Sequence, residues 1–470
     1  MADPRGFLKI RRADTPKRPA AERVKDWSEI TLPLLEIKSL DQAARCMNCG
    51  VPFCHQGCPL GNNVPTWNNL VHEGKWREAY EELSKTNPFP EFTGKLCPAP
   101  CEDACVLKIN DDPVTIKSIE WSIIERAARE GWVVPETPSV LTGMSVGVIG
   151  SGPAGLAAAF ELRRVGHEVT VIERSDRVGG LIRYGVPDYK MKKSLIDDRV
   201  RQLEGMGILF RLDTEVGIDV SFSEIRSEFD AILLSVGALK PRMLDVKGHD
   251  LPGVGLAMTY LTAQNRNLDS GVPIPEEWNA EGKDIVILGG GDTGADCYGT
   301  AIRQGAASVT QFDHYPDPNV FQPPRKWPEP VLRSRISPVH EEGGKREWSI
   351  QTTSVEGSTH VTGLRTCEVR IDGHLKIPVP GTERVIPADL VLLAIGFVGA
   401  EAEGFGVEMS RGKVKIDKRY RTEIPGVFAA GDASRGASLI VWAIADGRNA
   451  AREIDLYLRG KSSITRAFYS

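Results

Sequence analysis

The stretch from residue 144 to residue 174 constrains the fold more than any other part of this 470-residue chain. An apolar run that predicts a buried parallel strand leads into Gly150-x-Gly152-x-x-Gly155, and a helical pattern follows. The first glycine permits a tight turn, the second lets the backbone approach a phosphate, and the third lets the helix pack against the strand. Because the amides at the start of such a helix can face a pyrophosphate, the stretch predicts a Rossmann-type dinucleotide site.

An acidic residue strengthens this interpretation. A second predicted strand, residues 168–172, ends at Glu173, which lies 18 residues past Gly155. A carboxylate at that place can accept hydrogen bonds from the hydroxyls of a ribose. The combination favours a nucleotide site over a chance glycine-rich turn.

A second glycine-rich turn lies further along the chain. Residues 285–288 predict a strand, and the sequence GGGDTG follows it at the start of another helix. A plain turn between a strand and a helix is the alternative. Two such units in one chain predict two different nucleotides. The residues expected to bind the second nucleotide are Gly290, Gly291, Asp292, Thr293 and Gly294.

Three further segments suggest that the first domain is discontinuous. Residues 229–240 and 388–396 both predict buried strands that end near a glycine, and we expect the chain to cross between domains there. Near the C-terminus, a strand that reaches residue 430 runs into Gly431 and Asp432, whose carboxylate can lie near the ribityl chain of a flavin. A helix expected from Ser438 would direct its positive end at the negative charge that a reduced flavin develops.

Composition and charge exclude several classes of protein. With 41% hydrophobic and 26% charged residues, the chain is an ordinary globular protein with room for two or three domains. No stretch approaches the roughly 18 apolar residues of a membrane span, and a signal-peptide core is not found, so we expect a cytoplasmic protein. The net charge of −5 argues against a general nucleic-acid binder. Residues 5–25 are an exception, with eight Lys or Arg and two acids, and predict a solvated arm or a segment that docks on an acidic partner.

The cysteines predict a metal centre. Seven of nine fall in one short region, and in a reducing compartment we do not expect structural disulfides. The spacing is dense enough for two 4Fe-4S clusters, which need eight ligands. Zinc is the alternative, but a neighbouring flavin favours iron-sulfur because zinc carries no electrons. The seven are Cys46, Cys49, Cys54, Cys58, Cys97, Cys101 and Cys105, whereas Cys297 and Cys367 are expected in the core.

Six motifs together resemble the small subunits of glutamate synthase over nearly the whole chain. They are CMNCGVPFCHQGCPLGN (46–62), LCPAPCEDAC (96–105), GSGPAG (150–155), GGLIRYGVP (179–187), GGGDTGAD (289–296) and AAGDASRGASLIVWAIADGR (429–448). They are also similar to the N-terminal module of dihydropyrimidine dehydrogenase. The resemblance implies an α/β protein with two Rossmann-like domains preceded by an α-helical iron-sulfur domain. The expected domains are 1–140 for the clusters, 141–250 with 390–470 for FAD, and 251–389 for NAD(P)H.

The resemblance also implies the cofactors and their ligands. FAD would occupy the first nucleotide site, NADPH or NADH the second, and two 4Fe-4S clusters the cysteine-rich region. One cluster would be held by Cys46, Cys49, Cys54 and Cys105. The other would be held by Cys58, Cys97, Cys101 and the carboxylate of Glu120, for which a solvated helix position is the alternative. The residues expected at FAD are Gly150, Ser151, Gly152, Pro153, Ala154, Gly155, Glu173, Arg174, Gly180, Leu181, Gly237, Gly431, Asp432, Ser438 and Leu439.

By the same resemblance, the chain is the electron-input subunit of glutamate synthase. It would oxidise NAD(P)H and send electrons to a large subunit that makes L-glutamate from L-glutamine and 2-oxoglutarate. The chain has no cysteine pair beside the predicted flavin site, so a disulfide reductase is not expected. Two alternatives stay open: an electron-input subunit for another acceptor, such as ferredoxin or a pyrimidine reductase, and a nucleotide-binding scaffold without turnover.

The choice between NADPH and NADH depends on the end of the strand after the second turn. Residues 308–312 predict that strand, and it ends at Asp313 and His314. A carboxylate near a 2′-phosphate repels it by about 1 to 4 kcal/mol at about 4 Å, which favours NADH. The positive charge of Arg325, Lys326 or a protonated His314 could offset this repulsion. The sequence leaves both nucleotides open, and the resemblance slightly favours NADPH.

Overall fold

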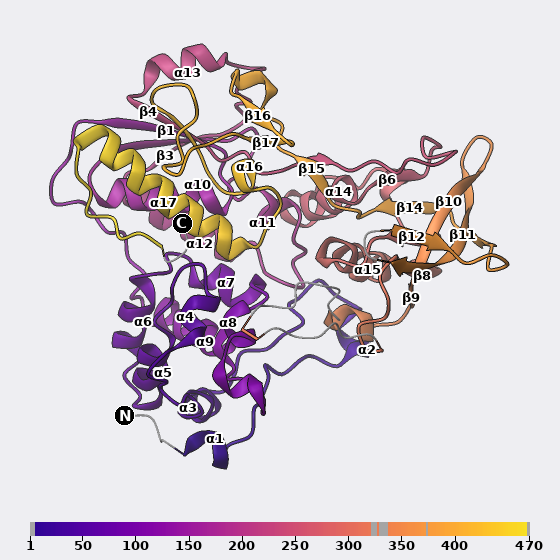
Figure 1. The fold of residues 1–470 in the computed structure, drawn as a ribbon, viewed down its shortest axis with the longest axis horizontal. Coiled ribbons are helices and arrows are strands. Elements are labelled where there is room, and N and C mark those ends of the chain that lie inside the picture. The colour runs from indigo at the N-terminus through magenta and orange to yellow at the C-terminus, as the bar shows by residue number, and fades with distance from the viewer. Residues whose placement is uncertain (1–4, 321–326, 329–336, 373–374, 468–470) are drawn as a thin grey trace.

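The structure is a computed structural model that describes residues 5–320, 327–328, 337–372 and 375–467. Figure 1 shows a helical N-terminal part beside two α/β parts, with the long C-terminal helix on the first of these. Among the described residues, no helix is long and apolar enough to cross a membrane.

Short helices form the N-terminal part. Their shared core contains Trp67, Phe89 and Phe92, which are fully buried. At the closest approach of two helices, a Cβ on Gly94 would lie only 3.0 Å from the Cα of Trp121, so the glycine permits the contact. The elements are α1 (Gly6–Lys9), α2 (Ala20–Arg23), α3 (Glu36–Ala44), α4 (Phe53–Gly57), α5 (Val64–His72), α6 (Trp76–Ser84), α7 (Pro90–Leu96), α8 (Pro100–Asp103), η1 (Val106–Ile109) and α9 (Ile116–Arg129).

The first α/β domain contains a parallel five-stranded sheet in the order β18-β4-β1-β2-β3. Its central strands are almost entirely apolar, as expected for strands covered on both faces. Helices α10 and α17 pack against one another beside this sheet (Figure 1). The elements are β1 (Ser145–Ile149), α10 (Pro153–Arg164), β2 (Glu168–Ile172), α11 (Leu181–Tyr184), α12 (Ser194–Gly205), β3 (Leu209–Arg211), α13 (Phe222–Glu228), β4 (Ala231–Leu234), β18 (Val427–Ala429), α16 (Asp432–Arg435) and α17 (Ile440–Arg459).

The second α/β domain repeats the plan with a parallel sheet in the order β6-β14-β7-β8-β9. An antiparallel group, β10-β11-β12 with β13 on β11, extends from it. The elements are β6 (Val254–Leu256), α14 (Ala257–Ser270), η2 (Glu276–Trp278), β7 (Asp284–Leu288), α15 (Asp292–Gln304), β8 (Ser308–Asp313), η3 (Pro338–Glu341), β9 (Lys345–Trp348), β10 (Ile350–Gly357), β11 (Val361–Asp372), β12 (Leu375–Pro378), β13 (Arg384–Pro387) and β14 (Leu390–Leu393).

The chain crosses between these domains twice, side by side. The outgoing strand β5 (Lys240–Pro241) pairs antiparallel with the returning strand β15 (Phe397–Gly399). Strand β14 belongs to the second sheet, so the chain returns to the first domain after Leu393, within the segment 388–396 where the sequence predicted a crossing. The remaining elements, η4 (Glu403–Phe405), β16 (Met409–Ser410) and β17 (Lys413–Val414), lie between β15 and β18 in the sequence.

Candidate functional site

A cavity of about 540 Å³ lies at the carboxyl ends of β1, β2 and β4. This is the switch point of the first sheet, where α/β proteins bind ligands, and the volume suits a cofactor. Thr293 and Leu393 of the second domain also line the cavity, so it extends between the two domains. The residues predicted at FAD that line it are Gly150, Ser151, Gly152, Pro153, Ala154, Glu173, Arg174, Gly180, Leu181, Gly237 and Asp432.

The three glycines of the first turn differ in what surrounds them. Gly150 has φ +101°, and a Cβ there would lie 2.6 Å from the carbonyl oxygen of Ser235. A Cβ on Gly155 would lie 2.0 Å from the carbonyl oxygen of Gly150, so this glycine brings α10 against the turn. A Cβ on Gly152 would meet no protein atom within 4 Å. The room beside Gly152 suits the close approach of a phosphate to the backbone.

Glu173 holds the first turn in place. It is buried at the end of β2, and one carboxylate oxygen accepts hydrogen bonds from the Ser151 amide at 2.9 Å and the Ser151 hydroxyl at 2.5 Å. The other oxygen accepts a hydrogen bond from the Ser175 amide at 2.9 Å. The contact of Glu173 with a ribose stays a prediction, and its support of the turn was not expected from the sequence.

The C-terminal segment reaches the same cavity. After β18, Gly431 adopts φ +65°, and the short helix α16, which was not predicted, comes before α17. The Ser438 hydroxyl donates a 2.6 Å hydrogen bond to the Asp432 carboxylate, whose pKa is raised by burial. Leu439 caps α17, so the predicted start of the helix near Ser438 is confirmed to within two residues.

The second turn has the same construction as the first. A Cβ on Gly294 would lie 2.2 Å from the carbonyl oxygen of Gly289, which has φ +124°, whereas a Cβ on Gly291 would meet nothing within 4 Å. Helix α15 begins at Asp292. The geometry therefore leaves room for a phosphate beside Gly291, as it does beside Gly152 in the first domain.

Asp313 lies at the end of β8, as predicted, and directly against the second turn. Its carboxylate accepts a hydrogen bond from the Tyr315 amide at 3.0 Å, and a Cβ on Gly290 would lie 1.8 Å from its other oxygen. Burial lowers the pKa of Arg346, on β9, and the negative charge of Asp313 acts against that shift. Burial lowers the pKa of His314, which disfavours the protonated ring that would supply a compensating charge. Arg325 and Lys326 lie outside the described residues.

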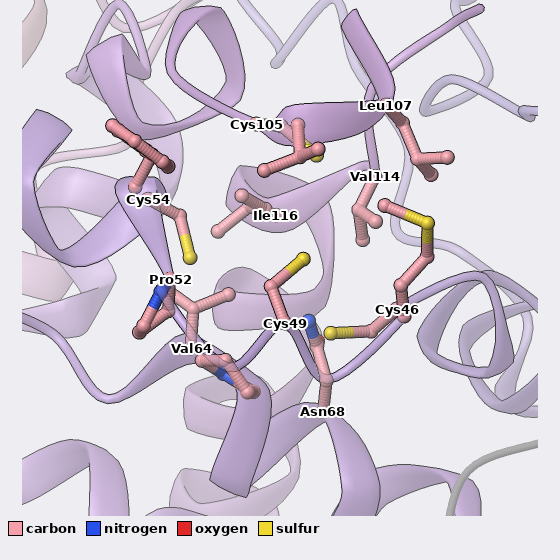
Figure 2. Close-up of a pocket in the computed structure, with 14 residues that line it drawn as sticks. Cys46, Cys49, Pro52, Cys54, Val64, Asn68, Cys105, Leu107, Val114 and Ile116 are labelled. Atoms are coloured by element: carbon pink, nitrogen blue, oxygen red, sulfur yellow. The ribbon is translucent and has the colours of Figure 1, made fainter. Parts of the chain in front are cut away.

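Four cysteines surround a small cavity in the helical part (Figure 2). Cys46, Cys49, Cys54 and Cys105 line it, which is the first ligand set that the resemblance implied. Asn68 also lines it, and its buried amide has no oxygen or nitrogen partner but lies against the Cys46 sulfur. An amide donor beside a ligand sulfur suits a 4Fe-4S cluster, whose sulfurs accept such hydrogen bonds.

The other four predicted ligands form a second, fully buried group. Burial raises the pKa of Cys58 to about 11 and of Cys97 to about 12, and the Glu120 carboxylate contributes to both shifts. Cys101 belongs to the same group, because Cys58, Cys97 and Glu120 all help to raise its pKa. Each of these side chains makes ionisation of the others less favourable. A positively charged metal centre bound among them would favour their anionic forms, which are the forms that bind metal.

Glu120 has polar neighbours that the sequence analysis missed. Burial raises its pKa to about 7, and the carboxylate accepts hydrogen bonds from the Thr93 hydroxyl and, at 3.3 Å, from the Asn87 amide. A solvated helix position is therefore wrong for Glu120. Within the described ranges, no three His, Cys, Asp or Glu side chains are arranged around a single metal ion. Cys297 and Cys367 are buried away from both groups, as expected.

The fold and these sites define a pyridine-nucleotide oxidoreductase joined to an iron-sulfur domain. Residues 144–447 match the pyridine nucleotide-disulphide oxidoreductase family, and residues 23–132 match the family of dihydropyrimidine dehydrogenase domain II with a 4Fe-4S cluster. FprA from Mycobacterium tuberculosis, solved in complex with NADPH, has the same fold at a TM-score of 0.55 and 18% identity, over 67% of this chain and 85% of that one.

The closer relatives are whole-chain matches. The glutamate synthase [NADPH] small chain of Mycobacterium tuberculosis strain H37Rv is 50% identical over 99% of this chain and 98% of that protein. The glutamate synthase [NADPH] small chain of Bacillus subtilis strain 168 is 45% identical, over 98% and 99% respectively. The chain belongs to the family of glutamate synthase small chains, which confirms the resemblance seen in its motifs.

Proposed function

We propose that this chain is the electron-input subunit of a glutamate synthase. It oxidises NADPH at the second nucleotide site, passes the hydride to FAD in the first, and passes single electrons through 4Fe-4S clusters to a large subunit. There, L-glutamine and 2-oxoglutarate become L-glutamate. The observation that carries the proposal is the cavity shared by both α/β domains, with two groups of predicted cluster ligands in the same chain.

The first turn would hold the FAD pyrophosphate. The amides at the start of α10 and the open space beside Gly152 favour a phosphate there, and Glu173 keeps the turn in the required shape. The positive end of α17, at Leu439, lies beside the Asp432 and Ser438 pair and would favour negative charge on the flavin. FAD, when bound, supplies the ability to accept two electrons together and to release them singly.

The second turn would hold NADPH. Thr293 lines the same cavity as Met258 and Tyr184, so a nicotinamide nucleotide bound at the second turn would share this space with the flavin. Hydride transfer needs reacting atoms about 3 to 3.5 Å apart and little acid or base assistance. The protein's contribution is therefore alignment of the two rings and exclusion of water.

Contacts between domains support an order in which electrons from the flavin reach the two ligand groups. Arg448 of α17 donates hydrogen bonds to the backbone oxygens of Thr86 and, at 3.3 Å, Lys85, and the next residue, Asn87, bonds to Glu120. The Glu120 group is thus next to the flavin domain. Cys49, in the other group, is partly exposed, and Val51 beside it is 60% exposed. We propose that electrons leave toward the large subunit at the Cys49 side.

A direct test is anaerobic rapid mixing of the purified chain with NADPH. The absorbance band of oxidised flavin should bleach, and signals of reduced 4Fe-4S clusters should follow it. A chain that binds flavin and NADPH without bleaching would support the scaffold alternative.

A second test identifies the partner. The chain should co-purify with a glutamate synthase large subunit and restore NADPH-dependent glutamate formation when the two are mixed. Restored reduction of ferredoxin or of a pyrimidine, without glutamate formation, would instead support the alternative acceptor.

A further inference from the structure

The basic N-terminal segment docks on acidic groups of its own chain. Residues 16–32 form a closed loop, in which the Arg18 amide donates to the Ile30 carbonyl and the Leu32 amide to the Pro16 carbonyl. Figure 1 shows α2 of this loop away from the other N-terminal helices and close to η3 of the second α/β domain. The loop therefore links the iron-sulfur part to the NADPH part of the molecule.

A buried ionic cluster fixes the tip of the loop. Arg23 Nε lies 2.6 Å from one carboxylate oxygen of Glu342, and Arg303 Nη1 lies 2.6 Å from the other. All three side chains are at most 1% exposed. Glu341 lies 3.2 Å from Arg23 and also pairs with Lys17, so every charged group of the cluster has a partner of opposite charge. Charges buried to this extent are tolerated only when they are paired, and the geometry of the loop tip is therefore strongly constrained.

The same loop fixes the segment that follows α11. The Ile30 amide donates a 2.8 Å hydrogen bond to the carbonyl oxygen of Tyr189, and the ring of Trp27 stacks on the Tyr189 ring at 6.3 Å. The guanidinium of Arg303 lies over the Tyr189 ring, 4.0 Å from its centroid. The Tyr189 hydroxyl donates to the carbonyl oxygen of Asp296 in α15 at 2.7 Å. Tyr189 is thus held between the N-terminal loop and α15.

These contacts connect both nucleotide sites. The segment that carries Tyr189 continues from Leu181 and Tyr184, which line the flavin cavity. Helix α15 carries the second turn at its first residue and Arg303 near its last turn. Arg23 is therefore joined through Glu342 and Arg303 to the last turn of α15, the helix whose first residue carries the second glycine-rich turn.

We propose that Arg23 is a positioning residue for hydride transfer from NADPH to FAD. It acts through Glu342, Arg303 and Tyr189 and touches neither nucleotide. This inference rests on the proposed function. It predicts that loss of Arg23 affects the alignment of the two rings more than the affinity for either nucleotide, since both glycine-rich turns stay intact.

The test compares Arg23→Met and Arg23→Lys with wild type in anaerobic stopped-flow reduction by NADPH. Arg23→Met leaves the Arg303–Glu342 pair in place, so an unpaired carboxylate is not created. The limiting rate of flavin reduction should fall by about tenfold to a hundredfold, because a shift of about 1 Å costs on that order. The apparent Kd for NADPH and the FAD and iron content should stay within about threefold of wild type, and Arg23→Lys should restore part of the rate.

Lys17→Met is the matched control. Lys17 pairs with Glu341 from the same loop, but both side chains are at least 40% exposed, and exposed pairs contribute little. An unchanged limiting rate in Arg23→Met, or an equal fall in Lys17→Met, would overturn the proposal. If Arg23→Met does not fold, a wild-type rate in Arg23→Lys overturns it in the same way. A wild-type chain whose flavin is not reduced by NADPH would instead refute the proposed function.

Discussion

The absence of a side chain at Gly152 should matter for cofactor binding and not for folding. Its backbone has ordinary negative φ, and a Cβ there would meet no protein atom within 4 Å. A larger residue is therefore compatible with the protein but not with a phosphate beside the backbone.

We expect Gly152→Val to fold and to purify without FAD. Gly291→Val is the matched control, because Gly291 occupies the same place in the second turn and is equally open. That variant should keep its flavin and lose affinity for NADPH by about tenfold or more. Flavin content and NADPH titration measure both effects, and normal FAD in Gly152→Val would refute the assignment of the first turn.

Asp313 provides a second prediction at this scale. A negative charge there should weaken binding of the 2′-phosphate of NADPH, although Arg346 close by compensates part of it. Asp313→Asn keeps an oxygen for the Tyr315 amide and removes the charge. The kcat/KM for NADPH should improve relative to that for NADH by about tenfold. Asp372→Asn, an exposed acid on β11, should leave the ratio unchanged, and an equal ratio in both variants would show that Asp313 does not face the ribose.

At the scale of the elements, the close approach of α17 to α10 leaves no room for a side chain at Gly447. A Cβ on Gly447 would lie 2.1 Å from the backbone carbonyl oxygen of Ala154, so α17 must move to accept one. Because the start of α17 borders the flavin cavity, that movement should also disturb FAD.

We therefore expect Gly447→Ala to lower both the melting temperature and the FAD content. Overpacking of this kind typically costs about 1 to 3 kcal/mol. Gly460→Ala is the control, because it adds the same methyl group at the open C-terminal end of the same helix, where it would meet no atom within 4 Å. The φ of +71° at Gly460 adds a small strain of its own. Thermal melts with and without added FAD separate the two effects. Full flavin occupancy in Gly447→Ala would contradict the link between this contact and the site.

Sequence patterns predicted the regular elements better than the irregular ones. Residues 168–172 are β2 with the expected bounds, and the strand expected at residues 308–312 is β8 to within one residue, because apolar residues recur regularly in both. The short helix α16 has four residues and no periodicity to read. The spacing of the cysteines predicted two centres, but the division of ligands between them came from the resemblance. Cys105 and Cys46 line one cavity in the folded chain, where α4 packs on α8, and the spacing of cysteines in the sequence does not show this packing.

At the scale of the whole molecule, the sequence did not show which acidic residues pair with the basic N-terminal segment. The basic segment near the N-terminus was expected to be solvated or to bind an acidic partner. Its partners include Glu341 and Glu342, which lie more than 300 positions away in the chain and adjoin segments without a recognisable pattern. Arg346, close to Asp313, was missed for the same reason.

Electron transfer through the whole chain gives the last prediction. Cys49→Ser removes one ligand from the group nearer the surface, so this cluster should be lost and the iron content should fall to roughly half. Reduction of FAD by NADPH should persist, since that step precedes the clusters, whereas electron delivery to the large subunit should stop. Cys367→Ser, a buried cysteine outside both groups, should keep full iron content. Iron analysis and electron paramagnetic resonance check the result, and loss of flavin reduction with FAD still bound would mean that the order of carriers is wrong.

The pairing of β5 with β15 bears on how such proteins can be recombined. The second α/β domain leaves and rejoins the first on two adjacent strands, which lie about 4.8 Å apart in any sheet. A module whose two ends meet can be exchanged for a homologous one without redirecting the host chain. Residues 242–396 are therefore a natural unit for grafting a different nucleotide preference onto an unchanged flavin and cluster scaffold, provided that the graft retains Arg303 and Glu342 for the N-terminal loop.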